Sequence, residues 1–232
     1  MDKISIAIPV FNRFELLVKC VEQILEDPRI NDITIVDDAS DPDVYRQIER
    51  WSLNYEHVFV FRNAENLDCY ANKHRAVECA QMDRVILFDS DNILTTAYID
   101  KIFEQYPWQP QTVYCPTFAR PHFDYRQFNG SIVSKSTVRF LMDNDTFRTA
   151  LNTANYFVPK QEYLMAWNPD INPHTADSIY MAYRLLEQGC HLAFIKGLEY
   201  DHLVHDGSHY KNNVHKTGNT EAHTIARLKG ME

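Results

Sequence analysis

Short apolar runs alternate with amphipathic stretches through the first half of the chain. Four runs are almost continuously apolar, as strands covered on both faces are; they span residues 4–10, 33–36, 58–61 and 85–88. Each is followed by apolar residues at helical spacing, which predicts helices over 16–25, from 42, over 70–80 and from 95 to 107. Strand and helix in this rhythm imply right-handed crossovers, an α/β fold and a mostly parallel central sheet flanked by helices.

Three helix starts carry a local signal. Asn12, with Glu15 three residues later, resembles a capping box. Pro42 follows Asp41 and is expected at the first helical position, where an N–H would have no helical partner. Thr95 is expected to begin the helix after the fourth strand.

The second half of the chain is less regular. Residues 108–133 are rich in aromatics, Pro and Gln and show no clear period. A strand is expected over 155–158 and a helix over 175–187, closed by Gly189. The tail is polar and His-bearing, with at most one short helix over 221–228. The chain contains no internal repeat and no low-complexity segment.

Composition narrows the class of protein. The 232 residues fit one α/β domain, and a net charge of −9 argues against nucleic-acid or anionic-membrane partners. Five cysteines without a CxxC pair predict reduced thiols in a cytoplasmic protein. We expect neither a signal peptide nor a membrane span, because no apolar stretch approaches ~18 residues.

Acidic residues follow the fourth predicted strand. Ligands of such sheets bind at the carboxyl ends of the strands, and Asp89-Ser90-Asp91-Asn92 comes directly after a buried run there. Two neighbouring carboxylates repel each other unless a hard cation such as Mg²⁺ or Mn²⁺ binds between them and phosphate. The same residue types are also common in turns, so a turn is the alternative interpretation.

A second acidic group, Asp37-Asp38, follows the second predicted strand. The helix behind it is already capped by Asp41, so these two carboxylates are not needed for capping. One of them could accept hydrogen bonds from a nucleobase N–H or from a ribose.

Four motifs in order resemble the GT-A fold glycosyltransferases, specifically the inverting family 2. They are Ile8-Pro9-Val10-Phe11-Asn12-Arg13, Val36-Asp37-Asp38-Ala39-Ser40, Asn66-Leu67 and the DXD motif Asp89-Ser90-Asp91. Thr153 to Lys160 and Thr175-Ala176-Asp177 add weaker matches. The resemblance implies a single Rossmann-like GT-A domain over 1–232, with a nucleotide-binding half over 1–107, an acceptor and catalytic half over 108–210 and a tail over 211–232.

The resemblance also implies roles for individual residues. Phe11 would stack on the base, although a core aromatic is the alternative. Asp38 would accept from the base N–H, which favours uracil or thymine, with guanine as a further alternative. Lys73 stands where the family usually has Arg, Asp89 would face the ribose, and Asp91 would ligate the divalent cation, Mn²⁺ or Mg²⁺. The remaining residues assigned to the nucleotide are Pro9, Asn12 and Ser90.

Asp177 would be the general base that takes the proton of the acceptor hydroxyl. The alternative is a carboxylate that only stabilises a helix N-terminus. The sequence departs from the family here, because the usual Glu-Asp pair is Ala176-Asp177 and one extra residue precedes Arg184, so Ser178 could occupy the expected register. Two further departures are Asp68, where the family favours Gly, and His74, where it favours Asn.

Histidines near the C-terminus are candidates for the metal shell. His202, or His205 as the alternative, resembles the His that completes this shell in several GT-A enzymes. His202, His205 and His209 also have zinc-like spacing, but Gly207 would break a helix and no Cys joins them.

The predicted activity is transfer of a sugar from a nucleotide diphosphate donor, favoured as a UDP-sugar, to a hydroxyl of a carbohydrate or glycoconjugate acceptor. A sugar-1-phosphate nucleotidyltransferase is one alternative, but it needs a Gly-rich phosphate loop that Pro9-Val10-Phe11-Asn12 lacks. A non-catalytic nucleotide-sugar or glycan-binding module is another, against which Asp91 and Asp177 argue.

Overall fold

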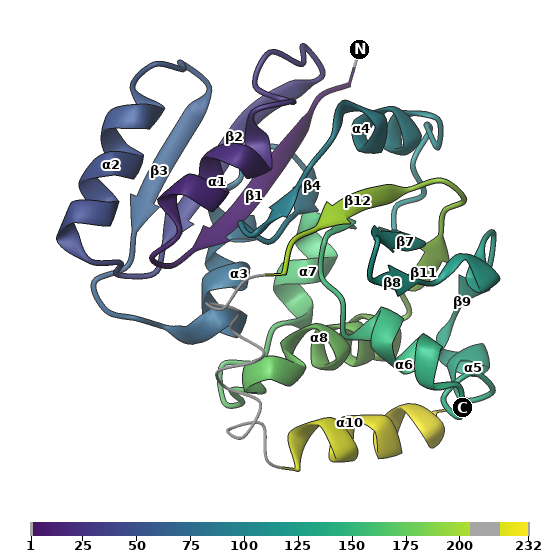
Figure 1. Cartoon of the computed structure of the whole chain (residues 1–232). Helices are drawn as coiled ribbons and strands as arrows, with labels where there is room; N and C mark the ends of the chain where they lie inside the picture. The colour runs from purple at the N-terminus through teal and green to yellow at the C-terminus, as the bar shows by residue number, and fades with distance from the viewer. Residues whose placement is uncertain (1, 205–218, 232) are drawn as a thin grey trace.

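The four predicted strands lie side by side in one large sheet (Figure 1). The computed structural model describes residues 2–204 and 219–231. Its main sheet has eight strands in the order β3-β2-β1-β4-β10-β6-β11-β9. In that order their bounds are Val58–Arg62, Ile30–Asp37, Ile4–Val10, Arg84–Leu87, Tyr156–Pro159, Thr112–Cys115, His191–Phe194 and Ile132–Val133. The α/β class is confirmed.

The sheet is mostly parallel, as predicted. Within the described residues four neighbouring pairs are parallel, β2–β3, β1–β2, β1–β4 and β6–β11, and three are antiparallel. The carboxyl ends of β1, β2 and β4 therefore meet at one edge, where ligands of such sheets bind. β10 runs antiparallel to β4, with Tyr156 opposite Leu87. This reversal brings residues 152–155, which precede β10, to the carboxyl end of β4.

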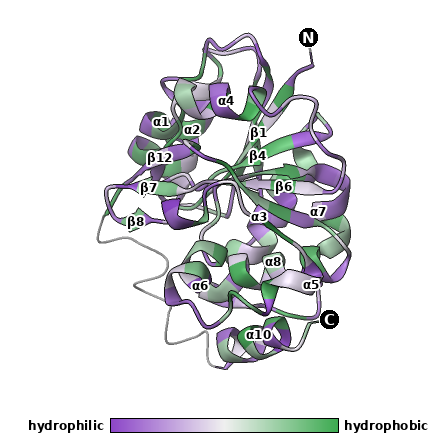
Figure 2. Cartoon of the chain, turned by 90° about the vertical axis from the view of Figure 1, so that its right-hand side faces the viewer, coloured by the Kyte–Doolittle hydropathy of each residue, from purple (hydrophilic) through white to green (hydrophobic). Residues whose placement is uncertain are grey.

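Helices cover both faces of the sheet. One face carries α1 (Phe14–Val21), α2 (Pro42–Ser52) and α4 (Thr96–Phe103), and the other carries α3 (Asp68–Cys79), α7 (Lys160–Ala166) and α8 (Asp177–Glu187). Along β1, Ile6 and Ile8 belong to the hydrophobic cluster that includes residues of α1, α2 and α4. Ala7 between them belongs to the cluster on the opposite face, with residues of α3, α7 and α8. This alternation is the two-residue period of a strand, and Figure 2 shows the hydrophobic colour along the central strands.

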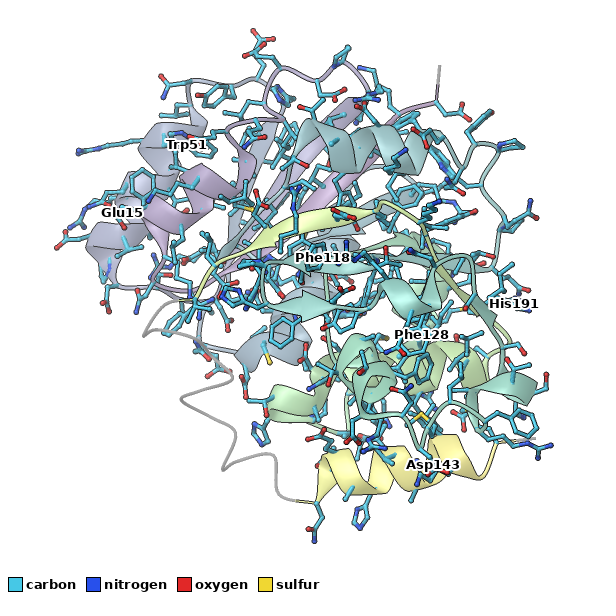
Figure 3. All side chains as sticks on the ribbon, turned by 45° about the vertical axis from the view of Figure 1, so that its right-hand side comes forward. Glu15, Trp51, Phe118, Phe128, Asp143 and His191 are labelled. Carbon is cyan, nitrogen blue, oxygen red and sulfur yellow. The ribbon has the colours of Figure 1, made fainter. Side chains whose placement is uncertain are left out.

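Residues 108–133, which show no clear period in the sequence, contain several short elements. β7 (Phe118–Arg120) and β8 (Phe123–Asp124) join β5 (Asn92–Ile93) and β12 (Glu199–His202) in a second sheet, in the order β5-β12-β7-β8. The 3-10 helix η1 (Arg126–Phe128) and the short helix α5 (Lys135–Val138) flank β9. Phe128 packs on Phe147 of α6 (Asp145–Leu151), with ring centroids 5.3 Å apart (Figure 3).

The predicted C-terminal helix is confirmed as α10 (Thr220–Lys229). It packs against α8, and Leu228 is buried there. Its last turn is held by an ion pair of 2.6 Å between Lys229 and Asp143, which lies beside α10 in Figure 3. None of the helices in the described part of the chain is long and apolar enough to cross a membrane.

Two of the predicted helix starts are corrected. The capping box of Asn12 and Glu15 is wrong: α1 begins at Phe14, the capping position belongs to Arg13, and no side chain caps the helix. Asn12 instead adopts a φ of 52° and ties the loop after β1 to the loop after β2. The helix predicted from 175 begins at Asp177, after the 3-10 turn η2 (His174–Ala176).

The other two starts are confirmed. Thr95 caps α4, and its side chain accepts a hydrogen bond from the backbone N–H of Tyr98. Pro42 is the first residue of α2, as predicted. Asp41 occupies the capping position, but its side chain makes no capping hydrogen bond, so the expected side-chain cap is wrong.

Candidate active site

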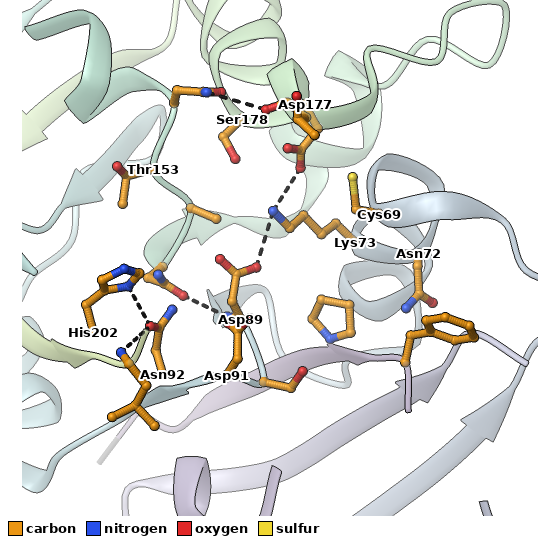
Figure 4. A pocket seen from close by; sticks show the side chains of 18 of the residues that line it. Cys69, Asn72, Lys73, Asp89, Asp91, Asn92, Thr153, Asp177, Ser178 and His202 are labelled. Carbon is orange, nitrogen blue, oxygen red and sulfur yellow. Dashed lines mark hydrogen bonds and ion pairs between the residues drawn. The ribbon is translucent and has the colours of Figure 1, made fainter. Parts of the chain in front are cut away.

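The predicted site residues converge on one cavity of about 990 Å³ (Figure 4). Of the assigned residues that the structure describes, all but Asn12 line it: Pro9, Phe11, Asp38, Lys73, Asp89, Ser90, Asp91, Asp177 and His202. His205 and His209 lie outside the described residues. The carboxyl ends of β1, β2 and β4 form one wall, and α6, α8 and β12 form the other, so the cavity lies where the two halves of the chain meet.

Asp38 is a buried acceptor on the first wall. Its Oδ1 accepts hydrogen bonds from the Leu67 N–H at 2.8 Å and from the Asn63 amide at 2.7 Å. Burial raises the pKa of the Asp38 carboxyl, and these two hydrogen bonds offset only part of the rise. The Asn66 amide donates to the backbone carbonyl of Asp38 at 3.1 Å, so the Asn66-Leu67 motif holds this carboxylate in place.

Phe11 directly follows β1, lines the cavity and is 45% exposed. A core aromatic would be buried, so the alternative interpretation of this residue is wrong. Asn12 does not line the cavity among the described residues; its Oδ1 accepts from the Asp41 N–H at 2.8 Å, and its own N–H donates to Ser40 at 2.8 Å. Asn12 thus shapes the loop that presents Phe11.

Lys73 connects the two walls of the cavity. Its ammonium lies 2.8 Å from Asp177 and 3.2 Å from Asp89, and its side chain is only 10% exposed. Burial disfavours the charged form, but the charges of Asp177 and Asp89 outweigh it, so the pKa of Lys73 lies well above its usual range. Burial also raises the pKa of Asp89, and the positive charge of Lys73 offsets part of this rise.

Asp177 is the first residue of α8. Carboxylates are stabilised at this position because they interact with the helix dipole and its exposed N–H groups. Asn152, which precedes β10, forms hydrogen bonds to residues on either side of Asp177 in sequence. Its amide donates to the Thr175 carbonyl, and its Oδ1 accepts from the Ile179 N–H, both at 3.4 Å. Ser178 also lines the cavity, but the ion pair with Lys73 belongs to Asp177.

Asp91 and His202 are the residues assigned to a metal. Asp91 pairs with Arg13 at 2.5 Å, and Nδ1 of His202 lies 2.9 Å from Oδ1 of Asn92. Within residues 2–204 and 219–231 no group of three or more His, Cys, Asp or Glu side chains could hold a metal ion. A divalent cation that also binds diphosphate needs only one or two carboxylates from the protein, so a site at Asp91 fits this chemistry.

The charge balance of the cavity favours a cation. Seven carboxylates line its described part, against three Lys or Arg side chains. The acids are Asp38, Asp68, Asp89, Asp91, Asp145, Asp177 and Glu221, and the bases are Arg13, Lys73 and Arg148. A diphosphate entering such a cavity would meet net negative charge, which a divalent cation would offset.

The backbone is strained around the cavity. Five non-glycine residues of the described chain have positive φ, and each lines the cavity or is adjacent in sequence to a residue that does: Asn12, Ala39, Asp68, Asn155 and His174. Such conformations cost up to about 1–3 kcal/mol each and persist where the surrounding structure enforces them, often at functional sites. One of these residues, Asn155, also contacts the site directly, because its Oδ1 accepts from the Asp89 N–H at 2.7 Å.

The two departures at Asp68 and His74 have structural roles. Asp68, at the start of α3, lies 2.9 Å from Nδ1 of His174, which precedes α8. His74 stacks on Trp167 of the neighbouring loop with ring centroids 4.1 Å apart, and burial lowers its pKa. Both contacts fasten α3 to the second half of the chain.

Sequence reasoning assigned no role to four further residues of the site. Arg13 pairs with Asp91, and Asn152 donates to the Thr175 carbonyl just before α8. Asn155 accepts from the backbone N–H of Asp89, and His174 pairs with Asp68. The local signals for them were the place of Arg13 in the first motif and the polar stretch 152–155 ahead of an apolar strand. Cys69 also lines the cavity, and burial raises the pKa of its thiol well above its usual range, which disfavours the thiolate form.

Comparison with known proteins gives matches at the levels of sequence and fold. The family model described as Glycosyl transferase family 2 matches residues 5–166. Glycosyltransferase GlyG of Streptococcus pneumoniae is 26% identical over 105 residues, which are 45% of this chain and 35% of GlyG. The chain thus matches about a third of the length of that curated relative.

Among solved structures, a 1–349 fragment of S. aureus TarS resembles the fold. It gives a TM-score of 0.69 at 11% identity, covering 97% of this chain and 69% of the fragment. Its complex with UDP-GlcNAc gives 0.71 at 12% identity, covering 96% and 66%. Its complex with UDP gives 0.65, also at 12% identity. At this identity the likeness shows the fold alone, and it confirms the GT-A prediction.

Proposed function

Because the chain belongs to glycosyltransferase family 2, we propose that it transfers a sugar from a UDP-sugar to an acceptor hydroxyl, with inversion at the anomeric carbon. The observation that carries this proposal is the ion pair of Lys73 with both Asp89 and Asp177. It sets a candidate base beside the strand end that would hold the donor. The family match ends at residue 166, so the role of Asp177 rests on its geometry and on the sequence motif.

The donor is proposed to bind along the carboxyl ends of β1, β2 and β4. Phe11 would stack on the base, and Asp38 would accept from its N–H, which suits uracil. Pro9 would pack beside the base and Ser90 beside the sugar-phosphate, with Asp89 at the ribose. The UDP and UDP-GlcNAc complexes of TarS support this choice of nucleotide.

A divalent cation, Mn²⁺ or Mg²⁺, would be held by Asp91, with His202 as a further ligand. When bound, it would supply positive charge to the departing diphosphate. Arg13, now 2.5 Å from Asp91, would lie beside the same phosphates. The seven carboxylates of the described cavity support this need for a cation.

The chemical step is a single displacement at the anomeric carbon. The acceptor oxygen would form a bond to that carbon while the bond from the carbon to the diphosphate oxygen breaks, and the electron pair leaves with the diphosphate. The hydroxyl proton would pass to Asp177 as general base. Lys73 holds Oδ2 of this carboxylate at 2.8 Å, so Oδ1 is the oxygen assigned to the proton. The transition state would be oxocarbenium-like.

Residues 1–107 would bind the nucleotide and residues 108–210 the acceptor, within a single domain. The five cysteines are free. Free thiols are typical of proteins in a reducing compartment, which supports the proposal that this protein acts in the cytoplasm.

The test is turnover of UDP-GlcNAc and UDP-glucose with Mn²⁺ or Mg²⁺, followed by UDP release and by NMR of the anomeric proton. We expect UDP release that requires the cation, and a product of inverted configuration. Retention of configuration, or preference for an adenosine or cytidine diphosphate sugar, would contradict the proposal. No release of UDP, together with binding of the intact donor, would favour a non-catalytic binding module.

A further inference from the structure

One wall of the cavity is a polar helix face that the donor assignment does not use. Five polar residues of α6 and the turn after it line the cavity at positions i, i+3, i+4, i+7 and i+8: Asp145, Arg148, Thr149, Asn152 and Thr153. Residues at this spacing share one side of a helix. The opposite side of α6 is apolar, and Phe147, Ala150 and Leu151 are buried there. The polar stripe is therefore directed at the cavity.

Three of these five residues carry neutral polar groups: the hydroxyls of Thr149 and Thr153 and the amide of Asn152. Thr149 donates to the Asp145 carbonyl at 3.0 Å, and Thr153 donates to the Thr149 carbonyl at 2.9 Å, so both hydroxyl oxygens keep capacity to accept. The Asn152 amide carries two donors, and one points to the Thr175 carbonyl. Such groups match the hydroxyls of a sugar ring.

The wall offers no unpaired cation in the described part of the chain. Arg148 forms an ion pair with Asp145 through Nη2, and its Nη1 donates to the Met142 carbonyl at 2.7 Å. Glu221, at the start of α10, adds a further negative charge to the lining. A phosphate or carboxylate on the bound molecule would find no counter-charge here, so an uncharged molecule fits better.

An exposed aromatic ring completes the wall. Phe123 of β8 is 38% exposed and lines the same cavity, with its centroid 5.1 Å from the ring of His202. It stacks almost parallel to Tyr125, whose hydroxyl lies 2.8 Å from that of Thr153. An apolar ring beside a few placed polar groups is the usual composition of a small-molecule site. The C–H face of a pyranose would pack on the Phe123 ring, and the hydroxyls at the edge of the sugar would form hydrogen bonds with the polar residues of α6.

We infer that Phe123 and the polar face of α6 bind an uncharged pyranose, the acceptor sugar of the proposed transfer. Asn152 links this wall to the residues flanking Asp177, so a sugar held here would lie next to the proposed base. The inference rests on the proposed function, and it adds the chemical class of the acceptor and the residues that select it.

The test is direct binding, measured without turnover. Saturation-transfer NMR uses the protein with UDP and Mg²⁺, and the probes are methyl β-D-glucopyranoside, methyl β-D-galactopyranoside and methyl N-acetyl-β-D-glucosaminide. Methyl β-D-glucuronide and glucose 6-phosphate are the charged counterparts. We expect signals from at least one neutral glycoside and weaker or no signals from the charged pair. Preference for a charged probe, or no signal from any neutral glycoside, would overturn the inference.

Variants locate the site. Phe123→Ala should weaken binding of the best neutral glycoside by about tenfold, which corresponds to ~1.4 kcal/mol. Phe123→Tyr should retain most of the wild-type binding. Phe140→Ala is the matched control, because Phe140 is 74% exposed and does not line the described cavity. Equal binding by Phe123→Ala and Phe140→Ala, both folded by thermal melting, would overturn the assignment of Phe123. Failure of the proposed function would instead appear as no cation-dependent UDP release in the wild-type protein.

Discussion

The ammonium of Lys73 lies 2.8 Å from the carboxylate of Asp177, and this contact joins α3 of the first half of the chain to α8 of the second. The same ammonium lies 3.2 Å from Asp89 at the end of β4. One buried cation therefore ties the proposed base to the strand end where the donor would lie. Substitutions at these three positions are expected to be non-additive, because the residues share one network.

Lys73→Met would leave two carboxylates near each other without their counter-charge. Breaking a buried ion pair costs about 3–5 kcal/mol, so we expect a clearly lower melting point. Lys101→Met is the control, since the Lys101–Glu104 pair is exposed and such pairs contribute about 0–1 kcal/mol. Scanning calorimetry without ligand measures both variants. Equal melting points for the two would show that the buried pair adds no stability.

Asp177→Asn should lower kcat by at least ~10²-fold, because general-base help is worth about 10²–10⁴ in rate. The affinity for the donor should change little, since the lost interaction belongs to the transition state. Asp170→Asn is the control, as Asp170 is an exposed acid of the preceding turn. Steady-state kinetics of UDP release and calorimetric titration with UDP separate the two effects. A variant with near-normal kcat would mean that another residue is the base.

Asp91→Asn should abolish cation-dependent donor binding and turnover while the fold stays intact. The physical reason is that amide oxygen is a weaker ligand than carboxylate for a hard cation. Titration with UDP in the presence and absence of Mn²⁺ measures the effect, with Asp143→Asn, on the exposed surface, as control. Full activity of the wild-type protein in excess EDTA would remove the metal from the mechanism.

Phe11→Ala should weaken UDP binding by about 1–3 kcal/mol, the scale of stacking between a base and an aromatic ring. Phe59→Ala on the edge strand β3 is a matched control, because Phe59 is similarly exposed but does not line the described cavity. Isothermal titration calorimetry provides both affinities. If the two variants bind UDP equally well, Phe11 does not contact the base.

Asp38→Asn should weaken the binding of uridine nucleotides more than the binding of cytidine nucleotides. The carboxylate is placed to accept from a base N–H, and uracil has that donor where cytosine has an acceptor. The loss of one hydrogen bond to a charged group corresponds to about 1.5–3 kcal/mol. Binding of UDP and CDP to wild type and variant measures the preference, and an unchanged ratio of the two dissociation constants would contradict the assignment.

Local pattern was enough to predict the first half of the fold. The buried strands, the start of α2 at Pro42 and the Thr95 cap of α4 depend on periodicity and on residues close in sequence, as does the short helix α10 near the C-terminus. The strand-end motifs could also be placed together, because the carboxyl ends of parallel strands share one edge of the sheet. Pro9, Phe11, Asp38, Asp89 and Asp91 accordingly line one cavity.

Contacts between distant segments decided the rest. The second sheet pairs β5 with β12, over one hundred residues later in the chain, so no local period marks it. The antiparallel direction of β10 was likewise set by its neighbours, and it brings Asn152 and Asn155 to the site. Sequence alone assigned Lys73 to the nucleotide, whereas the tertiary structure pairs it with Asp177, because a buried ammonium requires the nearest carboxylates whatever their separation along the chain.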